Sequence, residues 1–109
     1  MSYEWDRNIY SNPATFGLKL IDSADIAGSY EFDIFAIWTD GANIFWAIDS
    51  GCSCPVPFED YDDISDLQQG TYQELMAAIG TWGGYYRYNS VNAMHMSLID
   101  SVNEWRRHA

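Results

Sequence analysis

Two apolar runs flank the pair Asp40-Gly41 near the middle of the chain. Asp-Gly supplies the positive φ angles of a type I′ turn, the commonest tight β-hairpin connection. A two-residue loop there joins strands over 30–39 and 42–50 and pairs Phe35 with Trp46. Apolar residues occupy both faces of these strands near the turn. The pattern therefore predicts central strands covered on both sides, or covered on one side with an aromatic surface exposed on the other.

A third strand is predicted from Gly17 to about Ile26, ending at the turn signal over 27–29. The short aromatic segment over 85–88 could form a fourth strand. Strands that follow each other through short turns usually pair as neighbours. The sheet is therefore expected to be an antiparallel meander of three to four strands.

Two apolar stripes at helical spacing predict two helices in the C-terminal third of the chain. The first follows a capping box made by Thr71 and Glu74 and ends at Gly83-Gly84, and the second begins at Ser90. The fold class is therefore α+β, with the meander packed against two C-terminal helices in a single domain over 1–109. The stripes are Tyr72, Leu75, Met76, Ile79 and Trp82 in the first helix, and Val91, Met94, Leu98, Val102 and Trp105 in the second.

Residues 58–67 form an acidic segment that separates the predicted strands from the helices. Pro55 and Pro57 exclude a central strand before it, because proline cannot donate to a β-ladder. Apolar residues then recur at every third position from 58 to 67. That spacing predicts one or two helical turns laid against the sheet, with the acidic side chains outward.

The charge of the chain is strongly negative and unevenly placed. Sixteen Asp and Glu face five Lys and Arg, which gives a net charge of −11. Between Lys19 and Arg87 there are twelve acidic residues and no Lys or Arg. This excludes direct nucleic-acid binding through a basic footprint and attachment to anionic lipid. The acidic residues either keep the chain soluble or form a surface for a basic partner.

No apolar run approaches the roughly 20 residues that span a bilayer, so no membrane association is expected. The first eight residues carry two acids and no apolar region, which is unlike a secretory leader.

Cys52 and Cys54 form the most unusual chemical feature, a Cys-x-Cys pair. Structural zinc usually needs four ligands, and His95 and His108 lie about 20 Å apart along one predicted helix. A disulfide between the cysteines would be strained, and nearby acids would raise the pKa of either thiol. The expected state is two small, largely buried thiols, with no metal and no cofactor. The acidic segment also lacks the order of a calcium-binding EF-hand loop.

Motifs of catalysis are missing from the sequence. It holds no Gly-rich phosphate loop, no Gly-x-Ser-x-Gly elbow and no His-Glu-x-x-His pair. His95 lies beside an apolar stripe, where a partly buried structural role is expected, and the five tryptophans are expected in the core. The chain is therefore not expected to be an enzyme.

Several motifs resemble a family of small proteins of unknown function that bacteriophages of actinobacteria encode. The resemblance covers about residues 10–67. Its most specific part is the string Asp-Ser-Gly-Cys-Ser-Cys-Pro-x-Pro-Phe-Glu-Asp-Tyr at 49–61. It also includes Tyr10-x-Asn12-Pro13-x-x-Phe16-Gly17-Leu18, Ser29-Tyr30-x-Phe32-Asp33 and Trp38. The resemblance implies a viral accessory protein in the cytoplasm of a host bacterium and assigns no catalytic or binding residue.

The leading functional hypothesis is a non-enzymatic phage accessory protein that binds a host or phage protein with a basic surface. Such binding would serve host takeover or anti-defence, and one version is mimicry of DNA. Aromatic side chains would anchor the partner and carboxylates would select it. One alternative is a metal- or thiol-dependent protein centred on Cys52 and Cys54, and another is a small-ligand binder or an enzyme without a recognisable motif. The oligomeric state stays open. The predicted partner-binding residues are Phe58, Glu59, Asp60, Tyr61, Asp62, Asp63 and Asp66.

Overall fold

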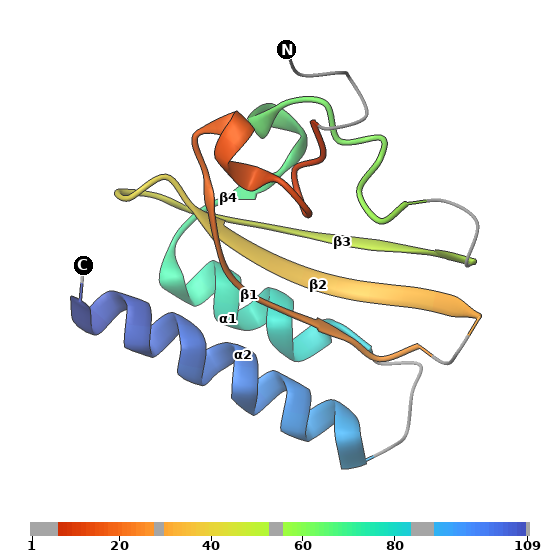
Figure 1. The fold of residues 1–109 in the computed structure, drawn as a ribbon. Helices are drawn as coiled ribbons and strands as arrows, with labels where there is room; N and C mark the ends of the chain where they lie inside the picture. Colours follow the sequence, from red (N-terminus) through yellow and green to blue (C-terminus); the bar gives the residue numbers. More distant parts are fainter. Residues whose placement is uncertain (1–6, 28–29, 53–55, 84–88, 109) are drawn as a thin grey trace.

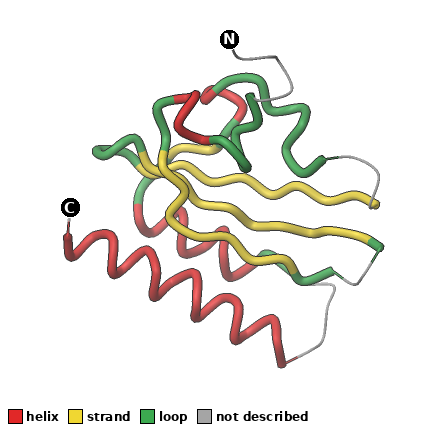
Figure 2. The backbone as a smooth tube through the Cα atoms, viewed as in Figure 1, coloured by secondary structure: helices red, strands yellow, loops and turns green. Residues whose placement is uncertain are grey.

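A four-stranded antiparallel sheet forms the middle layer of the structure, a computed structural model that describes residues 7–27, 30–52, 56–83 and 89–108. The strand order is β1-β2-β3-β4. Two helices cover one face of the sheet, and irregular segments with two short 3₁₀ helices cover the other (Figure 1, Figure 2). The elements are η2 (Pro13–Phe16), β1 (Lys19–Asp25), β2 (Glu31–Thr39), β3 (Ile44–Cys52), η3 (Ile64–Asp66), β4 (Gln68–Gln69), α1 (Tyr72–Thr81) and α2 (Asn89–His108).

This architecture confirms the predicted α+β class, with an antiparallel sheet and two helices after it. The fourth strand of the sheet is β4, whose two residues pair with Phe45 and Trp46 of β3. The segment over 85–88, a candidate for that strand in the sequence, lies outside the described residues.

The strand β2 is buried on both faces, which confirms the first of the two arrangements expected from its sequence. Its even-numbered apolar residues face the irregular layer, and Phe35 and Ile37 face the helices. Side chains alternate across a strand, so one continuous apolar run supplies two cores. We call these the loop-side core and the helix-side core.

The β2–β3 hairpin is present, but its register differs from the prediction by two residues. Thr39 pairs with Ile44, Phe35 lies opposite Ile48, and the predicted pairing of Phe35 with Trp46 is wrong. An even shift keeps every side chain on its expected face, so both cores keep the residues that the pattern assigned to them.

The shift arises because the turn is centred one residue later than expected. Asp40 takes the first position of the turn. Its carboxylate accepts hydrogen bonds from the amides of Ala42 at 2.9 Å and Asn43 at 2.7 Å. Gly41 has a φ of 105° and takes a central position of the turn. Aspartate favours the first turn position because its side chain can hold amides two and three residues later.

The helix α1 begins at the predicted capping box. The Thr71 hydroxyl accepts from the Glu74 amide at 3.2 Å, and the Glu74 carboxylate accepts from the Thr71 amide at 3.0 Å. The helix ends before Gly83, whose φ is 76°. His95 Nε2 lies 2.8 Å from the Trp82 carbonyl oxygen, in the partly buried structural role expected for it.

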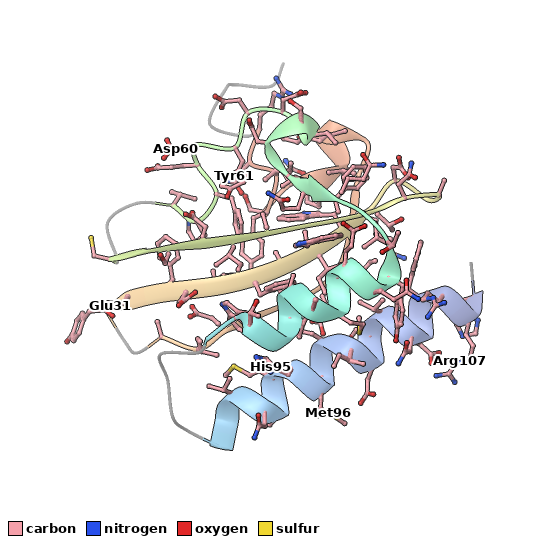
Figure 3. All side chains as sticks on the ribbon, turned by 180° about the vertical axis from the view of Figure 1, so that it is seen from behind. Glu31, Asp60, Tyr61, His95, Met96 and Arg107 are labelled. Atoms are coloured by element: carbon pink, nitrogen blue, oxygen red, sulfur yellow. The ribbon has the colours of Figure 1, made fainter. Side chains whose placement is uncertain are left out.

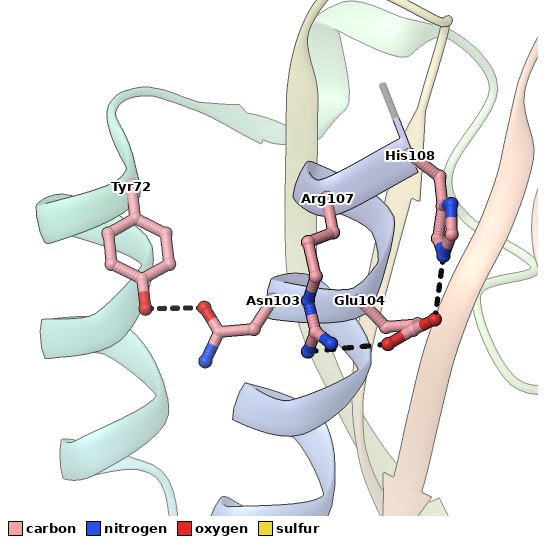
Figure 4. A network of polar contacts seen from close by, with 5 residues as sticks. All are labelled: Tyr72, Asn103, Glu104, Arg107 and His108. Carbon is pink, nitrogen blue, oxygen red and sulfur yellow. Dashed lines mark hydrogen bonds and ion pairs between the residues drawn. The ribbon is translucent and has the colours of Figure 1, made fainter.

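The two helices are joined to each other by polar contacts near the end of α2 (Figure 4). The Tyr72 hydroxyl donates to Asn103 Oδ1 at 2.8 Å, and the Arg106 guanidinium lies 3.8 Å from the centre of the Tyr72 ring. Glu104 makes an exposed ion pair with Arg107 and a hydrogen bond with His108 on the same helix. Exposed pairs of this kind stabilise little, so the Tyr72 contacts and the apolar stripe hold α1 against α2.

On the other face of the sheet, the segment that precedes β1, which we call the N-terminal segment, contacts both β2 and the residue before the acidic segment. The indole of Trp38 donates to the Ile9 carbonyl at 2.9 Å, and the Asn8 side-chain amide donates to the Pro57 carbonyl at 3.1 Å. Ile9 and Trp38 are fully buried in the loop-side core. These contacts fix where the acidic segment crosses the sheet.

Candidate functional site

Phe58 heads the acidic segment and is completely buried. Its ring lies 5.3 Å from the ring of Tyr10, 5.4 Å from that of Trp38 and 5.1 Å from that of Tyr61. A side chain without exposed surface cannot contact a partner of the folded chain. Phe58 is therefore a core residue, and its assignment to the partner-binding surface is wrong. It is the first of the apolar residues, spaced three apart, that pack this segment on the sheet.

The five acidic residues of the predicted site are all exposed, as expected, but they are not equivalent. Asp63 and Asp66 form a capping box at the start of η3. The Asp66 carboxylate accepts from the amides of Asp62 at 2.9 Å and Asp63 at 3.1 Å. Hydrogen bonds from the Ser65 hydroxyl and amide hold the pKa of Asp63 below its usual value, and the Arg7 charge acts in the same direction.

The remaining acids of the predicted site differ from Asp63 and Asp66 in their contacts. Among the residues that the structure describes, the side chains of Glu59, Asp60 and Asp62 have no hydrogen-bond or ion-pair partner. Asp60 extends away from the sheet, whereas Tyr61 lies against it (Figure 3). Three negative charges are therefore available to another molecule.

Tyr61 is half-buried between the acidic segment and β3. Its hydroxyl donates to the Ile48 carbonyl at 3.2 Å. Burial raises the pKa of Tyr61, and the charges of Asp49 and Asp66 raise it further. The phenol therefore stays protonated at neutral pH and keeps its role as a donor. Asp49 is itself held by the Phe58 amide, which donates to its carboxylate at 2.7 Å.

Beside Tyr61 lies a concave site that we call the edge groove. It has a volume of about 280 Å³ and lies where β4 ends and β3 continues. Trp46 and Ile48 of β3 line it together with residues of α1 and of the acidic segment. Its lining consists of Trp46, Ala47, Ile48, Tyr61, Asp66, Gln68, Ala78 and Thr81.

The edge groove combines apolar, hydrogen-bonding and acidic surface. Ile48 is 45% exposed, which is unusual for a large apolar residue in the sheet. Asp66 and Tyr61 come from the predicted site, whereas Ile48, Ala78 and Thr81 do not. These three could not be identified from the sequence, because their proximity depends on where β4 stops.

A second hollow lies between β1 and α2. It has a volume of about 770 Å³, is widely open to solvent, and includes Met96, which is 59% exposed (Figure 3). At its border the Ser101 hydroxyl donates to the Asp22 carboxylate at 2.6 Å. This hollow is a surface depression that lacks the enclosing walls of the edge groove.

The cysteine chemistry differs from the expectation. Cys52 ends β3 as a free, exposed thiol, so its predicted burial is wrong. Its position explains this, because even-numbered residues of β3 face the helix side, and the strand has left the helix-side core after Trp46, as the exposed Ile48 shows. Cys54 lies outside the described residues. Within the described part of the chain, no group of three or more His, Cys, Asp or Glu side chains could hold a metal ion.

Comparison with protein families matches residues 7–107 to a domain of unknown function, DUF7574. No curated protein and no solved structure gives a significant match. None of the described helices is long and apolar enough to cross a membrane. Since the family match extends over more than nine-tenths of the sequence, the chain belongs to the DUF7574 family.

Proposed function

We propose that this chain is a non-enzymatic phage accessory protein that binds a protein partner with a basic surface in the host cytoplasm. The observation that supports this most is the edge groove, where exposed apolar surface on β3 lies beside Tyr61 and Asp66 of the acidic segment. Interfaces are commonly built from an apolar centre with charged residues around it. In this proposal Ile48 and Tyr61 contact the partner, and Glu59, Asp60 and Asp62 attract it.

The charge distribution supports a basic partner. A net charge of −11 attracts cationic surfaces over about 8 Å at physiological ionic strength, and the acidic segment that contributes Asp66 to the groove also carries the exposed carboxylates of Glu59, Asp60 and Asp62. A partner that binds nucleic acid would suit this surface, because carboxylates can occupy positions meant for phosphates. Blocking such a protein would serve host takeover or anti-defence.

The experiment begins with affinity capture from host lysate and identification of the retained protein. Its binding kinetics are then measured with the purified chain at several salt concentrations. The test variant combines Asp60→Asn with Asp62→Asn, which removes two free charges and leaves the capping box of η3 intact. Glu31→Gln with Asp100→Asn is the matched control, since it removes two exposed charges from β2 and α2.

The acidic variant should associate about tenfold more slowly at low salt than the control, because charges around an interface act mainly on encounter. At about 1 M salt the range of electrostatic attraction falls to about 3 Å, so the two variants should associate at the same rate. Equal rates for both variants at low salt would show that the acidic segment only keeps the chain soluble.

A further inference from the structure

We propose that the partner binds by strand addition: an extended segment of the basic protein pairs with the free edge of β3 at Ser50 and Cys52 and places side chains in the adjoining edge groove. This inference rests on the proposed function and adds the mode of binding and the kind of segment recognised. Strand addition to an open sheet edge is a general mode of peptide recognition, in which backbone hydrogen bonds supply affinity and side-chain pockets supply specificity.

The first support is the unequal length of β3 and β4. The strand β3 has nine residues, and β4 has two, which pair with Phe45 and Trp46. Beyond Trp46, no strand among the described residues pairs with the outer edge of β3. An edge of this kind presents unpaired amides and carbonyls to any extended chain.

The second support is the direction of these backbone groups. In an antiparallel pair, alternate residues point their amide and carbonyl away from the neighbouring strand. The Ile48 carbonyl is directed outward, because it accepts from the Tyr61 hydroxyl. The same alternation directs the backbone groups of Ser50 and Cys52 outward. These two residues are available for pairing, whereas the Ile48 carbonyl already accepts from the Tyr61 hydroxyl.

The third support is a contrast between the two edges of the sheet. The strand β1 carries an irregularity between Leu20 and Asp22, and charged residues lie at both of its ends. Bulges and charges are the usual protection of an edge against pairing. The free part of β3 has no irregularity in its pairing with β2, and its charged residue, Asp49, is engaged by the Phe58 amide of the same chain.

The fourth support is the chemistry on the two sides of the edge. Side chains of an added strand would alternate between the two faces of the sheet. On the helix side they meet Ile48 and Ala78, which are apolar, and on the loop side they meet Asp66 and Tyr61. The groove therefore fits a segment in which apolar residues alternate with Lys or Arg.

The same charges argue against a second copy of this chain as the occupant. Pairing β3 with β3 of another copy would bring two chains of charge −11 together. It would also place Asp49 and Asp66 of each copy near those of the other, and like charges across an interface are unfavourable. A heterologous basic strand relieves this repulsion.

The test uses a capped synthetic peptide of about eight residues in which Lys alternates with Val, with a Glu–Val peptide as its control. Binding is measured by titration, and backbone amides are followed by hydrogen exchange. Ser50→Pro removes the outward amide at the centre of the free edge without removing a hydrogen bond to β2. Ser50→Ala is the matched control, because it keeps that amide.

We expect the Lys–Val peptide to protect the amides of Ser50 and Cys52 from exchange, and Ser50→Pro to weaken binding at least about tenfold relative to Ser50→Ala. Equal binding by these two variants would overturn strand addition. If Ser50→Pro does not fold, exchange in the unmodified chain decides alone: unprotected Ser50 and Cys52 amides in the peptide complex overturn the inference.

Failure of this inference is distinguishable from failure of the proposed function. Partner binding that persists in Ser50→Pro but slows in the Asp60→Asn, Asp62→Asn variant would retain the acidic surface and reject the strand. A dimer of the chain alone that Ser50→Pro dissociates would assign the edge to a second copy and overturn the basic segment. Stronger binding of the Glu–Val peptide would overturn the charge argument.

Discussion

Replacement of Phe58 tests how the acidic segment is fixed on the sheet. The residue combines a fully buried ring with a φ of 64°, a backbone conformation that L side chains seldom adopt. Its ring contacts those of Tyr10, Trp38 and Tyr61. The aromatic contacts thus hold a backbone that would otherwise relax, and the two contributions can be separated with two variants.

Phe58→Ala should lower the free energy of unfolding by about 3–5 kcal/mol, the usual cost of removing a buried phenyl ring. A chain of this length is stable by about 5–15 kcal/mol, so the variant should still fold. Phe58→Gly loses the same ring but escapes a left-handed penalty of about 1–2 kcal/mol. Against this, glycine adds about 0.5–1 kcal/mol of backbone entropy in the unfolded state. The difference leaves Phe58→Gly more stable than Phe58→Ala by up to about 1.5 kcal/mol.

Urea unfolding, followed by tryptophan fluorescence and circular dichroism, measures both differences. Glu59→Ala and Glu59→Gly are the matched pair at the exposed neighbour, whose φ is not positive, and there alanine should be the more stable variant. A loss below about 1 kcal/mol in Phe58→Ala would refute the buried position of the ring. If alanine is more stable than glycine at position 58 as well, the left-handed backbone is refuted.

Three further predictions concern α1 and the two turns. Hydrogen bonds from the Thr71 amide and hydroxyl lower the pKa of Glu74, so its contribution to stability is present above about pH 4.5 and is lost as the pH falls through the lowered value. In thermal melts, Glu74→Gln should reduce the decline of Tm in this acid range, and an unchanged decline contradicts the capping box. Gly83→Ala should cost about 1–3 kcal/mol in urea unfolding, because φ is 76° and a Cβ would lie 2.6 Å from Ile26 Cδ1. Gly41→Ala should cost less, about 1 kcal/mol, because its φ is positive but the space around it is open, and equal losses at the two glycines would show that the Ile26 methyl moves aside at little cost.

Much of the fold could be predicted because local signals and burial agreed. The stripe over 91–105 matches the face of α2 that packs on the sheet, and the capping box begins α1 where expected. The hairpin register could not be read from Asp40-Gly41 alone. Asp-Gly can occupy the two central positions of a turn, as predicted, or its first and second positions. The hydrogen bonds from the amides of Ala42 and Asn43 to the Asp40 carboxylate favour the latter arrangement.

The candidate site was predictable only in part, for a different reason. Periodicity placed Phe58, Tyr61, Ile64 and Leu67 on one face, but that same periodicity means burial, so Phe58 belongs to the core. The acids were predictable as exposed because no cation lies near them in sequence. The edge groove required the length of β4, and Gln68-Gln69 carries no signal that tells a strand of two residues from a loop.

The two-sided burial of β2 has a consequence for how the molecule opens. The loop-side core is built by segments without long helices, which are joined by contacts such as that of Asn8 with Pro57, 49 positions apart. The helix-side core is instead covered by α1 and α2. Local unfolding proceeds in cooperative units of unequal stability. The layer over the loop-side core can therefore open as one unit while the sheet and helices stay folded, and amides of the acidic segment would then exchange together with those of the N-terminal segment.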